Sequence, residues 1–292
     1  MSRERIVRAN GVALCVETFG DPAHLAILLI GGGASSMDWW EDEFCKRLAA
    51  GLRFVIRYDH RDTGRSTSYA PGVPPYTMKV LARDASGLLD ALDVKSAHLV
   101  GMSMGGTIAL YMALDQSARV ATLTLVSTSP GAAGPGKAKL PPMSRTLQEF
   151  FAKDTPPPDW RDRSAVIEYI VDGSRPFAGA RGFDEAHLRS LAGRVFDRTT
   201  NMEASFTNHA AVTGGGAVRA RLGELKLPTL VIHGTADPLF PYGHAQALAS
   251  EIAGARLLPL EGVGHEMPPA AVWDVVIPAI LSHSISGQEA PD

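Results

Sequence analysis

The chain has 292 residues, of which 45% are hydrophobic and 20% charged, and its formal net charge at pH 7 is −3. This size suits one large α/β domain with an insertion or two small domains, and the composition is that of an ordinary globular protein. The weak negative charge gives no reason to expect nucleic acid or an anionic membrane surface as a partner.

No targeting or membrane-spanning segment is expected. The N-terminus, MSRERIVRANG, lacks an apolar signal core, and no apolar run is long enough to cross a bilayer. We therefore expect a cytoplasmic protein. The only two cysteines, Cys15 and Cys45, lie in a strand-like and a helix-like run, which predicts two buried thiols and no disulfide.

The first part of the chain alternates strands with helices. Asn10-Gly11 predicts a hairpin between strands at 6–7 and 12–18. The continuous apolar run Leu25–Ile30 is typical of a strand covered on both faces, and it ends in Gly31-Gly32-Gly33. Further strands are predicted at 54–58, just before residue 103 and at 121–126, and helices at 39–50 (with Asp38 as N-cap), at 77–92 and after residue 103.

This alternation stops after Val126 and resumes near Thr229. Between them, helix-like pieces are predicted at 144–152, 161–171 and 185–198, followed by a flexible glycine run at 214–216. Strands at 229–233 and 256–260, helices at 242–252 and 270–284 and a frayed tail complete the chain. We predict an α/β fold with a mostly parallel central sheet flanked by helices: a core of 1–128 and 222–292, and a helical cap of 129–221.

The most informative stretch is AHLVGMSMGGTIAL, whose centre is the pentapeptide Gly101-Met102-Ser103-Met104-Gly105. A G-x-S-x-G pattern between a strand and a helix places the serine on a sharp turn, with its hydroxyl clear of the sheet. Apolar residues on both sides predict that strand and that helix. Ser103 is therefore our candidate nucleophile, against the alternative of an ordinary glycine-rich turn.

A serine hydroxyl needs a base within hydrogen-bond reach and an acid that orients the base. Among nine histidines, His265 in GVGHE follows the last predicted strand and would share a sheet edge with Ser103. Asp237 in HGTADP follows the preceding strand, and the order serine, acid, histidine is that of α/β-hydrolases. The other place where such enzymes keep the acid reads Val126-Ser127-Thr128-Ser129 and holds no carboxylate.

The other histidines are assigned less specific roles. His233 ends a predicted strand and is expected to be structural. His60 lies in a polar loop, where it could approach the site or make a local hydrogen bond. The rest, including His209 and His244, have ordinary surface or core interpretations.

Negative charge on a tetrahedral intermediate needs preorganised donors. The amide of Met104 is one candidate, because it lies at the start of a helix. The glycine turn after the LAILLI strand is expected to provide the other, from Gly33 or, alternatively, Gly32. Substrate contact is predicted for four aromatic residues that could equally be packing residues: Trp39, Trp40, Phe150 and Trp160.

Taken in order, the glycine turn, the loop DHRDTGRS at 59–66, the elbow, HGTADP and GVGHEMP resemble the α/β-hydrolase superfamily across nearly the whole chain. Within it, RYDHRDTGRST, VGMSMGGTIAL, ERIV and FGDPA most resemble the aclacinomycin methylesterase group. The resemblance implies a serine carboxylester hydrolase with a helical cap. It does not carry over the anthracycline substrate, and Gly31-Gly32 replaces the His-Gly pair that many members have at this turn.

We expect hydrolysis of a small-molecule carboxylic ester through an acyl-enzyme, such as a methyl ester of an apolar or polyketide-like molecule. The same triad could instead serve a lactone, a C–C bond or peracid formation. A hydrolase-like binding protein without turnover is the alternative from another class. No cofactor or metal is expected, and both a monomer and a homodimer are compatible with the sequence.

Overall fold

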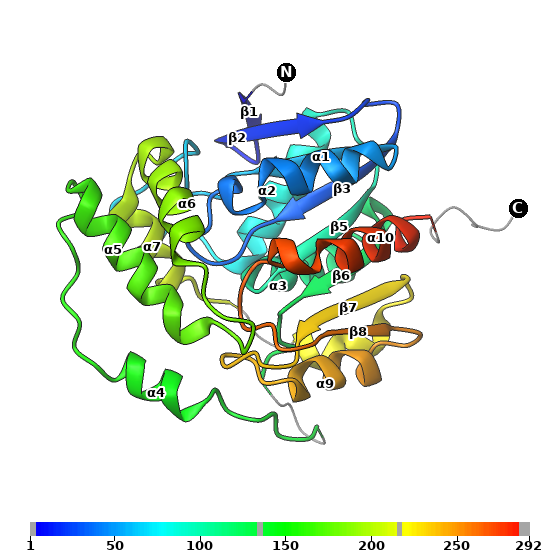
Figure 1. Cartoon of the computed structure of the whole chain (residues 1–292). Coiled ribbons are helices and arrows are strands. Elements are labelled where there is room, and N and C mark those ends of the chain that lie inside the picture. The colour runs from blue at the N-terminus through cyan, green and yellow to red at the C-terminus, as the bar shows by residue number, and fades with distance from the viewer. Residues whose placement is uncertain (1–3, 133–136, 215–217, 286–292) are drawn as a thin grey trace, which may run out of the picture.

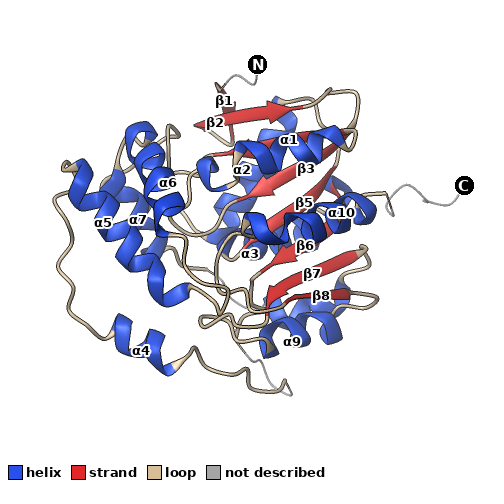
Figure 2. Ribbon diagram, in the orientation of Figure 1, coloured by secondary structure: helices blue, strands red, loops and turns tan. Residues whose placement is uncertain are grey.

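The computed structural model describes residues 4–132, 137–214 and 218–285. They form one eight-stranded sheet in the order β1-β2-β4-β3-β5-β6-β7-β8, with helices on both faces (Figures 1 and 2). Strand β2 pairs antiparallel with β1 and with β4, and every other neighbouring pair of these strands is parallel. The α/β prediction with a mostly parallel sheet is confirmed. The strands are β1 (Arg5–Ala9), β2 (Val12–Phe19), β3 (Leu25–Ile30), β4 (Arg53–Tyr58), β5 (Ala97–Met102), β6 (Val120–Val126), β7 (Thr229–Gly234) and β8 (Arg256–Leu260).

Strand β3 is buried on both faces, as its continuous apolar run predicts. Ile27 and Leu29 join a core with α1 (Asp42–Ala50) and α10 (Trp273–His283). Leu28 and Ile30 point the other way, because side chains alternate along a strand. Their core includes α2 (Met78–Ala91), α3 (Met104–Asp115), α8 (Val218–Arg221) and α9 (Gly243–Glu251).

Helices alone make up the regular elements of the described chain between β6 and β7. They are α4 (Arg145–Phe151), α5 (Arg163–Ser174), α6 (Glu185–Arg198), α7 (Met202–Ala211) and α8, with a short 3-10 turn η3 (Arg175–Phe177) after α5 and another, η4 (Leu222–Glu224), after α8. Figure 1 shows α5, α6 and α7 grouped beside one end of the sheet and α4 apart from them. These three helices share a small apolar core that includes Val166, Leu191 and Met202.

Two local predictions were wrong. Helix α7 was not predicted, because its sequence MEASFTNHAA has a weak apolar period, although Asn201 caps it by accepting from the Ala204 amide. The helix expected at 39–50 is the 3-10 turn η1 (Met37–Trp39) followed by α1. Asp38 therefore caps neither helix and instead accepts from the Ser36 hydroxyl and Arg198. Most of the predicted glycine run (215–216) and tail (286–292) lies outside the described residues.

A buried arginine joins α6 to the core. The Arg198 guanidinium donates to Asp59 (2.6 Å), Glu4 (2.6 Å) and Asp38 (3.0 Å). Asp59 is fully buried and also accepts from the backbone amides of Met37 and Arg65. Burial raises the pKa of Asp59, against the lowering effect of Arg198. The polar loop at 59–66 is thus a structural junction, since breaking such a pair would leave a buried charge without a partner.

Three side chains of helix α7 contact the same loop. The Ser205 hydroxyl donates to the Asp62 carbonyl, the Asn208 amide to the Asp62 carboxylate at 2.9 Å, and the His209 ring approaches the Arg61 carbonyl at 2.8 Å. All three side chains are buried. The helix that sequence patterns missed is therefore a main anchor of this helical segment on the sheet domain.

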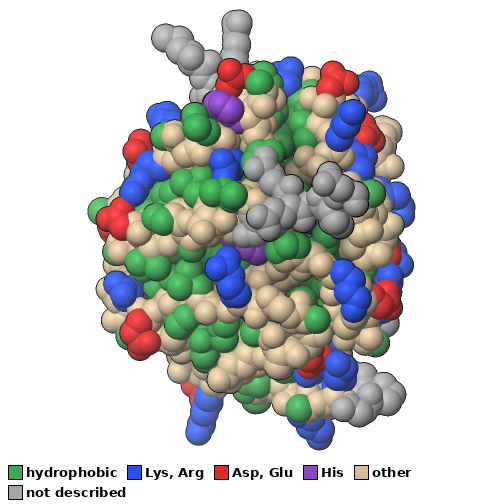
Figure 3. Space-filling model, turned by 90° about the vertical axis from the view of Figure 1, so that its right-hand side faces the viewer, with side chains coloured by type: hydrophobic (Ala, Val, Ile, Leu, Met, Phe, Trp, Pro, Cys, Tyr) green, Lys and Arg blue, Asp and Glu red, His purple; other side chains and the backbone are tan. Residues whose placement is uncertain are grey.

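Cys15 and Cys45 are free and buried, as predicted. No helix in the described part of the chain is both long and apolar enough to cross a membrane. Within the same residues, no cluster of histidine, cysteine and carboxylate side chains is arranged to hold a metal ion. On the face turned away from α5–α7, basic and acidic side chains are interspersed (Figure 3).

Candidate active site

Ser103 lies at a strained turn between β5 and α3. Its φ of 52° and ψ of −115° are unusual for a residue with a side chain. The turn requires glycine on both sides: a Cβ on Gly101 would lie 2.3 Å from the Gly105 carbonyl oxygen, and one on Gly105 would lie 2.2 Å from that of Ile30. The pentapeptide therefore folds as predicted, with the Ser103 side chain partly exposed.

His265 lies in the loop after β8 and contacts both of its predicted partners. Its Nε2 is 3.0 Å from Ser103 Oγ, and its Nδ1 is 2.8 Å from Asp237 Oδ2. Because the carboxylate accepts at Nδ1, this nitrogen carries the proton and the Nε2 lone pair faces the hydroxyl. Three side chains that lie 134 and 28 residues apart along the chain thus form one hydrogen-bonded series.

Three hydrogen-bond donors hold Asp237 just after β7. Its Oδ1 accepts from the Leu239 and Phe240 amides at 2.9 and 2.8 Å, and its Oδ2 accepts from His265. His233 Nε2 lies 3.3 Å from the same Oδ2. Burial by itself would raise the pKa of Asp237, but the interactions with His233 and His265 outweigh it and lower the pKa to about 2. The carboxylate is therefore ionised at neutral pH.

His233 has the structural position expected of it. Its fully buried ring donates from Nε2 to the Phe240 carbonyl at 2.7 Å, while its Nδ1 has no partner among the described residues. The ring therefore holds the turn that carries Asp237 through the Phe240 carbonyl, three residues after the carboxylate.

The residues predicted to provide anion-binding amides lie beside the serine. Met104 is the first residue of α3, where backbone amides lack intrahelical acceptors. A Cβ built on Gly32 would be 3.6 Å from Ser103 Cβ, and one on Gly33 would be 4.0 Å from Met104 Sδ. In the described residues, the amides of Gly32 and Gly33 have no hydrogen-bond acceptor. Both remain candidates for the second donor.

The four aromatic candidates lie in different surroundings. Trp39 and Trp160 pack against the small core of α5–α7, and Trp160 stacks on Phe206 at 5.3 Å. Phe150 is half-buried and contacts Phe151. Trp40 was wrongly predicted as a substrate contact: it is 2% exposed and packs against Phe44 in the core between the sheet, α1 and α10.

Two aromatic residues border the histidine more closely. Phe240 packs edge-on against the His265 ring at 5.2 Å, and Phe177 lies 6.0 Å from it. Phe240 was missed because it belongs to no motif, although it follows Asp237 by only three residues. Phe177 comes from η3, so the helical segment reaches the loop that carries His265.

Backbone contacts also join this segment to the His265 loop. The His265 amide donates to the Phe177 carbonyl at 2.8 Å, and the Arg181 amide to the Gly262 carbonyl at 3.2 Å. Gly179 allows this approach, because a Cβ there would lie 2.2 Å from the Gly262 carbonyl oxygen and 2.4 Å from the Gly264 amide. The position of His265 therefore depends on the residues that follow η3.

Replacing Gly179 with alanine is expected to lower kcat by about 100-fold for any reaction in which His265 takes part, because a displacement of ~1 Å at a reacting group has an effect of that size. The new methyl group would push apart two backbone segments, one of which carries His265. Steady-state kinetics checks this result. Gly173→Ala is the matched control, since its Cβ meets open space within α5, and its kcat should equal the wild-type value.

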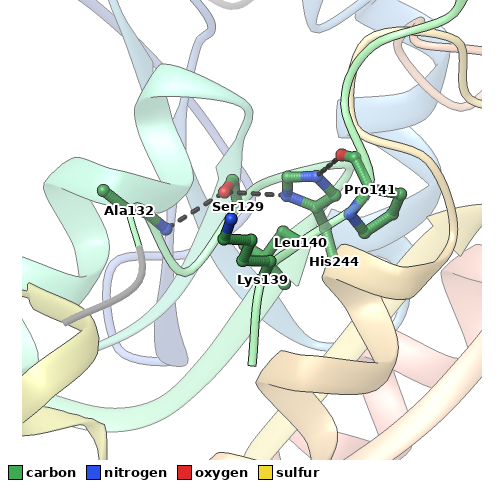
Figure 4. A pocket seen from close by; sticks show the side chains of 7 residues that line it. Ser129, Ala132, Lys139, Leu140, Pro141 and His244 are labelled. Carbon is green, nitrogen blue, oxygen red and sulfur yellow. Dashed lines mark hydrogen bonds between the residues drawn. The ribbon is translucent and has the colours of Figure 1, made fainter. Parts of the chain in front are cut away.

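A separate cavity of about 420 Å³ lies beside β6 and α9 (Figure 4). Its lining includes Ser129, whose hydroxyl bonds to His244 Nδ1 at 2.9 Å, while His244 Nε2 donates to the Pro141 carbonyl at 2.9 Å. The Gly131 amide donates to Ser129 Oγ. This second serine–histidine pair has a carbonyl where Asp237 provides a carboxylate for His265.

Comparison with known proteins agrees with the fold described above. The α/β hydrolase fold family model matches residues 26–268. Rhodomycin D methylesterase DauP of Streptomyces sp. (strain C5) is 35% identical, and DnrP of Streptomyces peucetius is 33% identical, each over 96% of this chain and 97% of its own length. The enol-lactonase of Burkholderia xenovorans LB400 has the same fold, with 23% identity and a TM-score of 0.73 over 96% of this chain and 99% of its own. The chain belongs to the α/β-hydrolase fold family.

Proposed function

We propose that this protein is a serine hydrolase that cleaves a carboxylic ester through an acyl-enzyme. The observation that carries the proposal is the hydrogen-bonded series from Ser103 through His265 to an ionised Asp237. Its placement at a strained elbow beside free backbone amides adds support, since acyl transfer needs a base, an orienting acid and an anion site together.

The reaction follows from the hydrogen-bond directions. His265 Nε2 accepts the Ser103 proton as Oγ attacks the ester carbonyl carbon. Asp237 stabilises the imidazolium that forms, and the amides of Met104 and of Gly33 or Gly32 stabilise the oxyanion. His265 then protonates the departing alcohol. In the second half it takes a proton from water, whose oxygen attacks the acyl carbon, and returns the proton to Ser103 as the acid leaves.

A methyl ester is the substrate class that we propose. The two relatives at 33–35% identity are named as methylesterases, and they match this chain over nearly its full length. The aromatic rings of Phe177 and Phe240 beside His265 favour an apolar acyl group. We further propose that 129–221 forms a cap over a core of 1–128 and 222–292, because α5–α7 have their own core and η3 contacts the His265 loop.

The test is hydrolysis of p-nitrophenyl esters of increasing acyl length and of methyl esters of aromatic acids. It is run beside γ-lactones and a fluorophosphonate probe. We expect turnover of esters, with the probe attached to Ser103 in a peptide map. Turnover of lactones alone would move the proposal to a lactonase. Folded protein that neither turns over any substrate nor reacts with the probe would indicate a binding protein instead.

A further inference from the structure

The glycine turn after β3 is held at three successive peptide planes. No peptide bond in the described chain is cis, so the carbonyl and the following amide of each plane point in opposite directions. The Gly31 carbonyl shares its plane with the Gly32 amide, and the Gly32 carbonyl shares the next plane with the Gly33 amide. Fixing either carbonyl therefore fixes the direction of a candidate oxyanion donor.

Both carbonyls have donors. His60 Nε2 lies 3.1 Å from the Gly31 oxygen and must carry a proton there, since a carbonyl only accepts. The Ser35 amide donates to the Gly32 oxygen at 3.3 Å. His60 is 1% exposed, and burial lowers its pKa to about 3, so the ring is neutral.

The third plane is held by a residue from α7. The Ala34 amide donates to His209 Nδ1 at 2.9 Å. Because Nδ1 accepts, the ring proton is on Nε2, which donates to the Arg61 carbonyl at 2.8 Å. Ala34 has a φ of 58°, a left-handed conformation that a residue with a Cβ keeps only when its surroundings fix it. His209, which lies 175 residues further along the chain, provides that restraint.

The two imidazoles also contact one another. Their centroids are 5.9 Å apart in an edge-on arrangement, and both rings are buried. Burial lowers the pKa of His209 too. A protonated His209 would face the Ala34 amide with a second N–H group, so the arrangement requires His209 to be neutral.

We propose that His60 and His209 are positioning residues for the oxyanion turn. His60 fixes the peptide plane that carries the Gly32 amide, and His209 fixes the Ala34 end of the turn, next to the plane that carries the Gly33 amide, so that these amides point towards the substrate carbonyl oxygen. The inference rests on the proposed function, since it assigns a role in the same oxyanion site. It also means that the helical segment between β6 and β7 would take part in transition-state stabilisation through α7.

Amide substitutions separate this role from simple packing. Asparagine places its side-chain amide near the position of Nδ1, and glutamine places it near Nε2. H209N can still accept from Ala34, whereas H209Q cannot. At position 60 the requirement is reversed: H60Q can still donate to Gly31, whereas H60N cannot. Each position thus supplies its own matched control.

We expect H209Q and H60N to lower kcat for p-nitrophenyl butyrate by about 10- to 100-fold, the size typical of small misplacements, with little change in KM. H209N and H60Q should retain most of the wild-type kcat. Inhibition by phenylboronic acid, which forms a tetrahedral adduct with a serine, should weaken in H209Q and H60N by a similar factor. Melting temperatures measured for all four variants show whether any loss merely follows stability.

The crossed preference, asparagine at 209 and glutamine at 60, supports the proposal. Equal losses for both amides at each position, following the melting temperature, would overturn it, as would unchanged kcat in H209Q and H60N. If H209Q does not fold, the pair at position 60 carries the same comparison. Absence of Ser103-dependent turnover in the wild type is a different result, because it defeats the proposed function before any histidine variant is made.

Discussion

Replacing Ser103 with alanine is expected to lower kcat for ester hydrolysis by up to about 10⁶-fold, as for other serine hydrolases that lose the nucleophile. Without Oγ there is no acyl-enzyme, and His265 has nothing to deprotonate in the first step. The rate left over would come from substrate binding and the backbone amides around the site. Steady-state kinetics and loss of fluorophosphonate labelling measure the effect.

Ser129→Ala is the matched control for this experiment. Ser129 also bonds to a histidine ring at 2.9 Å, but His244 donates to the Pro141 carbonyl, and the Ser129 oxygen already accepts from Gly131. We expect kcat and labelling to equal those of the wild type. Loss of activity in Ser129→Ala with full activity in Ser103→Ala would transfer the nucleophile to the second pair and contradict our assignment.

Replacing Asp237 with asparagine is expected to lower kcat by about 10⁴-fold with the fold intact, the effect known for a triad whose histidine takes the wrong tautomer. The asparagine oxygen can keep both bonds from the Leu239 and Phe240 amides. Its NH₂ group would then face His265 Nδ1, so the ring would take its proton on Nε2. That nitrogen could no longer accept the Ser103 proton.

The lowered pKa of Asp237 also predicts that the difference in stability between the wild type and Asp237→Asn depends on pH. Its folded-state pKa of about 2 lies below the ordinary value of 3.8. A carboxyl group whose pKa is lower in the folded than in the unfolded protein stabilises the fold at pH values above its unfolded-state pKa. This contribution is lost as the pH falls through the folded-state pKa. Urea unfolding at pH 5 and pH 2 should therefore show the stability advantage of the wild type over Asp237→Asn shrinking at the lower pH.

Asp84→Asn provides the control for loss of a buried carboxylate elsewhere. Asp84 accepts two bonds from Arg61, at 2.6 and 2.7 Å, and belongs to no triad contact. We expect lower stability with kcat unchanged at a temperature where the protein is folded. Equal kcat losses in both variants would mean that Asp237 acts through stability alone.

The helical segment between β6 and β7 contacts the site at two places. Residues after η3 pack backbone to backbone against the His265 loop. His209 on α7 accepts from the Ala34 amide, directly after the glycine turn. A cap attached in this way would influence the base and the oxyanion donors, in addition to any contact with substrate.

Sequence patterns were sufficient wherever the physical cause is local. A strand buried on both faces must be continuously apolar, which identified Leu25–Ile30. A tight strand-to-helix turn excludes a Cβ on either side, which identified the elbow around Ser103. Polar residues directly after parallel strands meet at one sheet edge, which brought Asp237 and His265 into consideration together.

Patterns failed where a residue's partner lies far away in the chain. Asp38 is of a residue type that often caps helices, but in the fold it accepts a hydrogen bond from Arg198, which lies 160 residues further along the chain. Trp40 follows Trp39 directly, yet one is buried in the main core and the other packs on α5–α7. Helix α7 has little apolar period, because its buried side chains Ser205, Asn208 and His209 are polar and bond to the loop at 59–66.

The sequence by itself therefore determined the fold class, the elbow and the three members of the candidate triad, since each depends on short-range sterics or on the position of a residue relative to its own strand. Only the tertiary structure decided which residues hold that triad and the glycine turn in place. His209, Phe177, Gly179 and Arg198 act across many intervening residues, and the chain sequence does not record which distant groups will share a buried hydrogen bond.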